Sequence, residues 1–235
     1  MDEVRALCFD VFGTVVDWRS GVAREAEAVL GAKGHRLDWP GFADRWRALY
    51  QPAMEAVRSG RRPFVTLDVL HRENLAALLA EYGIAGAAEA ELDRLNLAWH
   101  ALDPWPDAVP GMERLARRYI LASLSNGNVR LIVDMAKRAG LPWDVVLGAE
   151  AARAYKPAAE AYDAAARMLG LEPAQCLMVA AHPSDLESAA ARGFATAYVC
   201  RPLEYGPDRP PRRPAAGRFD IQAEDFLDLA QKLGA

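Results

Sequence analysis

The sequence predicts an α/β fold: a parallel sheet covered by helices, with a separate block of helices inserted into it. One observation is that strand-like and helix-like stretches alternate after residue 104, which is typical of a parallel sheet covered on both faces. Another is that a strand-like run, residues 4–10, stands apart at the start of the chain. We therefore expect a core of residues 1–15 and 104–235 and a helical insertion of residues 16–103.

Four amphipathic stretches fill the insertion and are expected to be helices. They cover residues 20–33, 40–58, 66–82 and 88–101. Closely spaced prolines in residues 103–107 are expected to exclude regular structure and to end the block. Since the insertion leaves the chain just after the first strand, it is expected to hang over the carboxyl edge of the sheet as a lid.

The rest of the chain alternates between strands and helices. Strands are expected at residues 119–124, 145–148, 176–181 and 196–200, and helices at residues 128–139, 158–169, 184–192 and 223–233. Residues 201–218 are rich in proline and are expected to be irregular. This core is Rossmann-like, and in such sheets ligands bind beyond the carboxyl ends of the strands.

Composition limits the class of protein. The chain has 235 residues, of which 52% are hydrophobic and 26% charged, as in a soluble globular protein. A net charge of −4 gives no reason to expect nucleic acid or an anionic membrane as a partner. Cys8, Cys176 and Cys200 lie in apolar runs and are expected to be reduced core residues. With no leader and no apolar run near 18 residues, a cytoplasmic chain is expected.

Polar side chains gather where the predicted strands end. In chain order they are Asp10 and Thr14, Ser125 and Asn126, Lys156, and His182 and Asp185. Each has an ordinary explanation: Asp10 suits a turn, Ser125 suits a helix N-cap, and Lys156 suits a solvated loop. Because the carboxyl ends of parallel strands meet at one edge, four such clusters favour a shared active site.

These clusters resemble the motifs of the haloacid dehalogenase superfamily. FDVFGT is similar to its first motif, LSNGN to its second, YKP to its third and AAHPSDL to its fourth, so the resemblance covers nearly the whole chain. Within the superfamily, LSNGN, YKPAAEAY and PWPDAVPG most resemble the type II 2-haloacid dehalogenases. The resemblance implies a core of the haloacid dehalogenase type with a helical cap, a small haloacid substrate, no metal or cofactor, and a homodimer.

The resemblance also implies roles. Asp10 would displace the halide with inversion, giving an aspartyl ester that water hydrolyses to a 2-hydroxy acid. Lys156 would keep Asp10 ionised, and Asp185 would hold Lys156 and help to position water. Arg47, on the first long cap helix, would bind the carboxylate or the halide. The other residues that the resemblance places at the nucleophile or substrate are Val11, Phe12, Thr14, Phe64, Ser125, Asn126 and Tyr162.

A magnesium-dependent phosphatase or phosphonate hydrolase is the main alternative. Such enzymes carry a second aspartate two residues after the nucleophile to protonate an alkoxide, and that position is Phe12 here. The fourth motif offers only Asp185 where Mg²⁺ wants several oxygen ligands. Since a halide leaves without a proton, dehalogenation is favoured. A non-catalytic binding protein is a further alternative, against which the intact Asp10, Lys156 and Asp185 argue.

His182 departs from the type II pattern, in which asparagine often occupies its position and serine that of Ala180. Three roles are open for this histidine. It is the base for the hydrolytic water, or a side chain that narrows the pocket toward haloacetates, or a structural residue.

Overall fold

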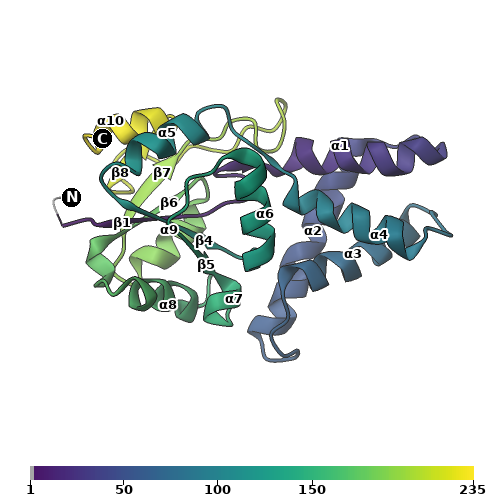
Figure 1. Ribbon diagram of the computed structural model, residues 1–235, viewed down its shortest axis with the longest axis horizontal. Coiled ribbons are helices and arrows are strands. Elements are labelled where there is room, and N and C mark those ends of the chain that lie inside the picture. Colours follow the sequence, from purple (N-terminus) through teal and green to yellow (C-terminus); the bar gives the residue numbers. More distant parts are fainter. Residues whose placement is uncertain (1–2) are drawn as a thin grey trace.

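The computed structural model, which describes residues 3–235, contains a six-stranded sheet with helices on both faces and a group of helices at one end (Figure 1). Residues 1 and 2, which the sequence assigns to the core, lie outside the described residues. The strands are β1 (Ala6–Phe9), β4 (Ile120–Ser125), β5 (Val145–Gly148), β6 (Cys176–Ala180), β7 (Ala195–Val199) and β8 (Ile221–Ala223). Their order is β5-β4-β1-β6-β7-β8 and every neighbouring pair is parallel, which confirms the predicted α/β class.

Strand β1 lies in the middle of the sheet. It pairs with β4 on one side and β6 on the other, so that Phe9 stands opposite Ser123 and Val179. All four residues of β1 are fully buried. The residue that follows β1, Asp10, therefore emerges at the centre of the carboxyl edge, where the strands on either side of β1 end as well.

Helices cover both faces of the sheet (Figure 1). One face packs against α8 (Ala159–Leu169) and α9 (Pro183–Ala190), and the other against α5 (Ala108–Leu115), α6 (Val129–Ala139) and α10 (Phe226–Lys232). Successive strand residues point to opposite faces: Leu7 and Phe9 of β1 join one hydrophobic cluster and Cys8 the other. The short helices α7 (Ala149–Ala152) and η3 (Pro173–Gln175) complete this part.

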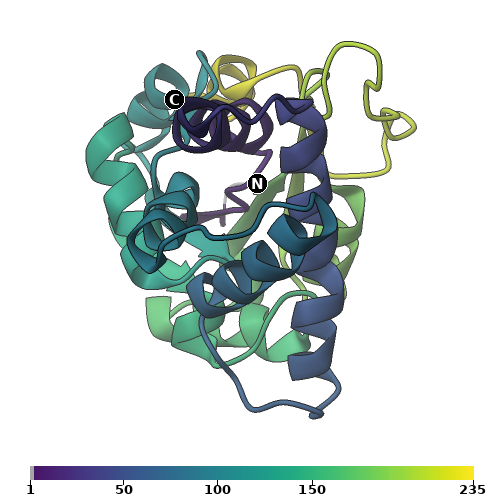
Figure 2. The same ribbon diagram turned by 90° about the vertical axis from the view of Figure 1, so that its right-hand side faces the viewer.

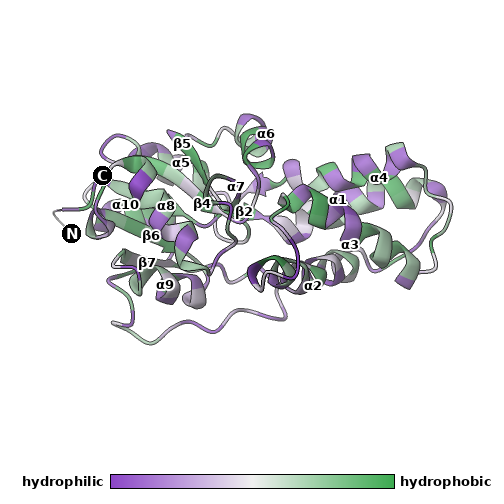
Figure 3. Ribbon diagram, turned by 90° about the horizontal axis from the view of Figure 1, so that it is seen from below, coloured by the Kyte–Doolittle hydropathy of each residue, from purple (hydrophilic) through white to green (hydrophobic). Residues whose placement is uncertain are grey.

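The remaining helices pack together in a separate group, which we call the helical unit (residues 18–100). It contains α1 (Trp18–Leu30), η1 (Gly31–Lys33), α2 (Trp39–Arg58), α3 (Leu67–Glu81), α4 (Glu89–Asn96) and η2 (Leu97–His100). Figure 3 shows it beyond the carboxyl edge of the sheet, and in Figure 2 it faces the viewer, in front of the sheet. Two short antiparallel strands, β2 (Val16–Asp17) and β3 (Asp103–Pro104), connect it to the sheet.

Large aromatic side chains fill the interior of the helical unit. Trp18, Trp46 and Trp99 are almost completely buried, and the rings of Trp46 and Trp99 meet edge to face at 5.5 Å. Burial of such large apolar surfaces stabilises the packing of α1, α2 and η2.

Three local predictions were wrong. Residues 103–104 are not irregular but form β3. Pro104 is tolerated there because β3 is an edge strand, paired with β2 alone in a two-stranded sheet. The sequence analysis also missed α5 and strand β8. The closing helix starts only at Phe226, where the side chain of Asp225 caps it by accepting from the Asp228 amide.

Within residues 3–235, none of the helices combines the length and the apolar character needed to span a membrane.

Candidate active site

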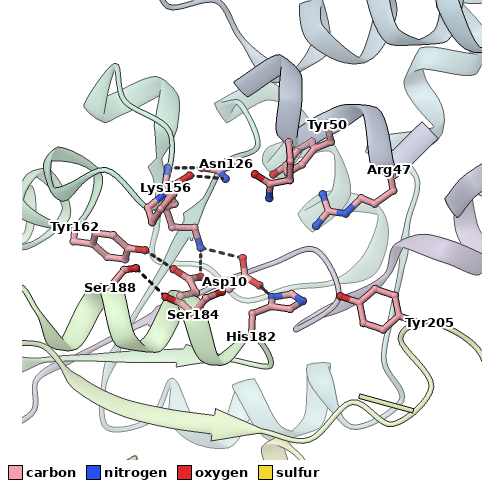
Figure 4. Close-up of a pocket in the computed structure, with 13 residues that line it drawn as sticks. Asp10, Arg47, Tyr50, Asn126, Lys156, Tyr162, His182, Ser184, Ser188 and Tyr205 are labelled. Carbon is pink, nitrogen blue, oxygen red and sulfur yellow. Dashed lines mark hydrogen bonds and ion pairs between the residues drawn. The ribbon is translucent and has the colours of Figure 1, made fainter. Parts of the chain in front are cut away.

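Asp10 is held by three hydrogen-bond donors at the end of β1, of which Figure 4 shows Lys156 and His182. The Nζ of Lys156 donates to its Oδ1 at 3.0 Å, and the Oγ1 of Thr14 donates to its Oδ2 at 2.8 Å. The Nδ1 of His182 lies 2.9 Å from the same Oδ2. Thr14 is itself fixed, since its hydroxyl accepts from the Ala181 amide at 2.9 Å.

These partners keep Asp10 ionised. The carboxylate is only 7% exposed, and burial alone would raise its pKa. The charge of Lys156 and the hydrogen bonds from His182 and Thr14 outweigh burial and hold the pKa of Asp10 well below its usual range. At neutral pH the site therefore presents a buried carboxylate anion, which is a nucleophile or a cation ligand.

Lys156 is fixed through its backbone as well as its side chain. Its amide donates to Oδ1 of Asn126 at 2.7 Å, and its carbonyl accepts from Nη1 of Arg58 at 3.1 Å. Its Nζ also contacts Oδ2 of Asp185. Burial lowers the pKa of Lys156, but the charges of Asp10 and Asp185 raise it well above its usual value, so the ammonium is retained.

Asp185 lies on the far side of Lys156. The hydroxyl of Tyr162 donates to its Oδ1 at 2.6 Å, while its Oδ2 faces the lysine. Burial raises the pKa of Asp185, and the nearby charge of Asp10 acts in the same direction against the attraction of Lys156. Asp185 is thus a better proton acceptor than a carboxylate in water.

His182 connects Asp10 to Glu204, a residue that the sequence analysis missed. Its Nε2 lies 2.9 Å from Oε1 of Glu204, which also accepts from Nε1 of Trp18 at 3.3 Å. Burial lowers the pKa of His182, but the charges of Glu204 and Asp10 outweigh it and raise the pKa to about 10. The available signal was positional: Glu204 follows closely the end of strand β7, within the segment expected to be irregular.

Arg47 extends from α2 toward the same pocket (Figure 4). Its guanidinium lies over the ring of Tyr50 at 4.2 Å and within 5.7 Å of the rings of Trp18 and Phe12. Its Nη1 is buried and has no hydrogen-bond partner among residues 3–235. A buried guanidinium nitrogen without a partner favours an anionic ligand.

These side chains surround one cavity of about 420 Å³ at the junction of the sheet and the helical unit. Its lining consists of Asp10, Arg47, Tyr50, Gln51, Asn126, Lys156, Pro157, Tyr162, His182, Ser184, Asp185, Ser188 and Tyr205. Besides Glu204, six lining residues were not predicted from the sequence: Tyr50, Gln51, Pro157, Ser184, Ser188 and Tyr205. They lie on helices and loops and give no distinctive pattern in a single sequence.

Four residues expected at the substrate do not line the cavity. Val11 is fully buried, and Phe12 packs edge to face on Trp99 at 5.9 Å, beneath Arg47. The ring of Phe64 lies against Tyr155 at 5.2 Å, away from the cavity, so it is not a wall of the pocket. The Oγ of Ser125 accepts from the Gly127 amide at 3.0 Å and so shapes the turn.

The acids of this site face cations. Asp10 and Asp185 share Lys156, and Glu204 faces His182. In the part of the chain that the structure describes, no group of three or more His, Cys, Asp or Glu side chains is arranged to hold a metal ion.

A parallel α/β sheet with this set of residues at its carboxyl edge corresponds to a known class of hydrolases. Residues 4–193 match the family model described as haloacid dehalogenase-like hydrolase, and the chain belongs to this family. Comparison with individual relatives gives a narrower class. It is 32% identical to (S)-2-haloacid dehalogenase 4A of Burkholderia cepacia over 211 residues, which cover 87% of this chain and 88% of that protein.

Solved structures give the same result. A defluorinating L-2-haloacid dehalogenase is 50% identical, with a TM-score of 0.96 over 99% of this chain and 96% of that one. The L-2-haloacid dehalogenase of Xanthobacter autotrophicus with chloropropionic acid covalently bound is 25% identical, with a TM-score of 0.83 over 99% of both chains. The relative and the two structures named here are 2-haloacid dehalogenases, hydrolases acting on carbon–halide bonds, which confirms the resemblance seen in the sequence and does not favour the phosphatase alternative.

Proposed function

We propose that this protein hydrolyses short 2-haloalkanoic acids, such as haloacetates and (S)-2-halopropionate, to 2-hydroxy acids through an ester on Asp10 and without a metal ion. The observation that carries the proposal is the position of Asp10. Its carboxylate is kept ionised by Lys156, and it shares a cavity with Nη1 of Arg47, which has no hydrogen-bond partner in the described part of the chain. The pair suits a small molecule with a carboxylate at one end and a leaving group beside it.

In the first step, Oδ1 of Asp10 attacks the carbon that bears the halogen. Oδ2 already accepts from Thr14 and His182, whereas Oδ1 accepts, among residues 3–235, from Lys156 alone and keeps a lone pair for the attack. A new C–O bond forms as the C–halogen bond breaks, and the halide leaves with the bonding pair. No proton is needed, which agrees with an apolar Phe12 where a phosphatase has an acid.

In the second step, water attacks the Cγ of Asp10. Asp185 accepts a proton from the water, and the negative charge that develops on Oδ2 is stabilised by the donors already bound there. The Cγ–Oδ1 bond then breaks, Lys156 gives a proton to the departing alkoxide, and Asp185 returns its proton to Lys156 through their direct contact. Asp10 is regenerated with one oxygen from water, and one proton is released to solvent.

We assign the residues 16–103 to a cap that closes this site. Arg47, Tyr50 and Gln51 come from its helix α2 and complete the cavity above Asp10. In this role Arg47 binds the carboxylate of the substrate or the departing halide, and the cap keeps bulk water from the nucleophile.

The proposed substrates include fluoroacetate. The defluorinating enzyme named above is 50% identical to this chain, which supports displacement of fluoride as well as chloride. The test is release of chloride and fluoride from haloacetates and (S)-2-chloropropionate, with and without EDTA. Chelator-resistant halide release is expected, whereas magnesium-dependent phosphate release from phosphate esters without halide release would overturn the proposal.

We further propose that the enzyme acts in the cytoplasm as a homodimer. The buried free thiols Cys8, Cys176 and Cys200 suit a reducing compartment. On the helical unit, Val69 and Leu97 are 41% and 52% exposed and offer apolar surface for a second copy.

A further inference from the structure

We propose that Glu204 is a positioning residue that keeps His182 protonated, so that the imidazolium stabilises the oxyanion formed on Asp10 and is not the base for the hydrolytic water. This inference rests on the proposed ester mechanism and deepens it.

Both ring nitrogens of His182 face carboxylate oxygens. Nδ1 lies 2.9 Å from Oδ2 of Asp10 and Nε2 lies 2.9 Å from Oε1 of Glu204. An ionised carboxylate only accepts hydrogen bonds, so each contact needs a hydrogen on the ring nitrogen. A neutral ring carries one such hydrogen and would leave two lone pairs facing each other, whereas the imidazolium satisfies both contacts.

Glu204 is built into this position. It is 1% exposed, and Nε1 of Trp18 also donates to its Oε1. It packs so closely on Gly13 that a methyl group there would lie 2.1 Å from Oε1, and Gly13 has a φ of +86°, which favours glycine. The glycine of the first motif therefore also makes room for this carboxylate.

The segment that carries Glu204 is anchored to the same loop. Nε of Arg201 donates to the Thr14 carbonyl at 2.7 Å, and its two terminal nitrogens donate to the carboxylate of Asp107 at 2.7 and 2.8 Å. Arg201 is 5% exposed, so this bidentate pair is shielded from water. Glu204 is consequently held at a fixed distance from the nucleophile, as a positioning role requires.

Glu204 matters most for the protonation of His182 once the ester intermediate has formed. Before the reaction His182 contacts two anions, and Lys156, Arg47 and Asp185 are the other charged side chains around the cavity. Alkylation removes the charge of Asp10, and Glu204 is then the one carboxylate in contact with the ring among the described residues. It is Glu204 that retains the proton on His182 while water attacks the ester.

A protonated His182 has a defined task in that step. Its Nδ1–H and the hydroxyl of Thr14 both point at Oδ2, the ester carbonyl oxygen, and the negative charge of the tetrahedral intermediate develops there. The proton of the attacking water goes to Asp185, as described above, so His182 neither gains nor loses a proton during turnover.

The test uses Glu204→Gln in the full-length enzyme, with Glu224→Gln as a control, because Glu224 is exposed and pairs with Arg213 far from the cavity. An amide oxygen can still accept from Trp18 and His182, so the variant is expected to fold. In substrate-free enzyme, ¹⁵N NMR of His182 should show a doubly protonated ring from pH 6 to 9 in the wild type and a clearly lowered pKa in Glu204→Gln.

Single-turnover kinetics give the second readout. In Glu204→Gln, hydrolysis of the ester from (S)-2-chloropropionate should slow by about tenfold or more between pH 6 and 9, as the ring loses its proton, while chloride release changes little. If His182 were the base, the rate would rise over this range instead. A rise with pH, or NMR titrations that are the same in both proteins, would overturn the inference. Failure of the wild type to release halide would refute the proposed function, whereas the NMR titration still tests the pairing of Glu204 with His182.

Discussion

At the scale of single residues, three acids and three cations lie in or beside the cavity. Asp10 and Asp185 pair with Lys156, and Asp10 and Glu204 pair with His182, whereas Arg47 lies over aromatic rings. Burying a single charge costs several kcal/mol, and the cationic partners of the three acids offset that cost. One guanidinium nitrogen of Arg47 lacks a hydrogen-bond partner among residues 3–235, so it can donate to an anionic substrate.

Replacing Lys156 tests the activation of the nucleophile. Lys156→Met removes the cation that holds Asp10 ionised and should lower the rate of halide release by about 10² to 10³-fold. Lys137→Met, at an exposed residue of α6, is the matched control and should match the wild type. Stopped-flow measurement of the halide burst decides the matter, and a burst within a few-fold of the wild type in Lys156→Met would refute this role.

Variants of two neighbouring arginines distinguish a role in substrate binding from a general effect of surface charge. Arg47 faces the cavity, whereas Arg45 is exposed and paired with Glu81. Arg47→Lys should raise KM for chloroacetate by about tenfold or more, because an ammonium cannot reproduce the guanidinium geometry. Arg45→Lys should leave KM unchanged. Steady-state kinetics with both variants would contradict the assignment if the larger effect came from Arg45.

Individual residues were predictable from the sequence where they belong to a motif at a strand end. Asp10 and Asp185 follow the buried strands β1 and β6, Lys156 follows β5 and α7, and the three meet at one edge, as the parallel sheet requires. Glu204 and Tyr205 were not predictable in this way, because their segment has no periodicity and its path depends on the anchoring of Arg201. Phe64 was misplaced because its loop turns toward Tyr155.

At the scale of elements, a histidine joins the helical unit to the sheet part. His100 of η2 lies 3.0 Å from Asp68 of α3 through Nε2 and 3.0 Å from Asp134 of α6 through Nδ1. Asn128, the residue before α6, donates to the same Asp68 at 2.8 Å. Burial lowers the pKa of His100, but the two aspartates raise it above its usual value.

This contact predicts a pH-dependent stability. The pKa of His100 is higher in the folded state than its value of about 6.5 in the unfolded state. Its contribution to the free energy of unfolding is therefore fully present below the unfolded-state pKa and is lost as pH rises through the folded-state pKa. His100→Gln should therefore lower the free energy of unfolding by about 1 to 2 kcal/mol at pH 6 and by less at pH 9. Urea unfolding measures this, with His35→Gln as control. An equal loss at both pH values would show that the charge of His100 contributes nothing.

Long elements were easier to predict than short ones. The helices α1, α2 and α3 carry helical periodicity over 13, 20 and 15 residues, and β1 is a continuous apolar run, so these elements were expected. Helix α5 and strand β8 are short, and β8 is defined by its pairing with β7 rather than by its own composition. Pairing partners far away in the sequence cannot be read from a local pattern.

At the scale of the whole molecule, the chain is expected to pair with a second copy. The chain mass is 25.7 kDa, and the proposed dimer would therefore have about twice that value. Sedimentation equilibrium at micromolar concentration should give the dimer mass, and Leu97→Glu on the exposed face of η2 should shift it toward the monomer. A wild type that sediments at the monomer mass throughout would contradict the dimer.

The central claim is that water attacks the carboxylate of Asp10 rather than the substrate. The most direct measurement is a single turnover in H₂¹⁸O with enzyme in excess of (S)-2-chloropropionate, followed by mass spectrometry of the peptide that contains Asp10 and of the 2-hydroxy acid. Attack at Cγ of the ester places ¹⁸O in Asp10 and leaves the product hydroxyl unlabelled. Label in the product and none in Asp10 would contradict the covalent mechanism.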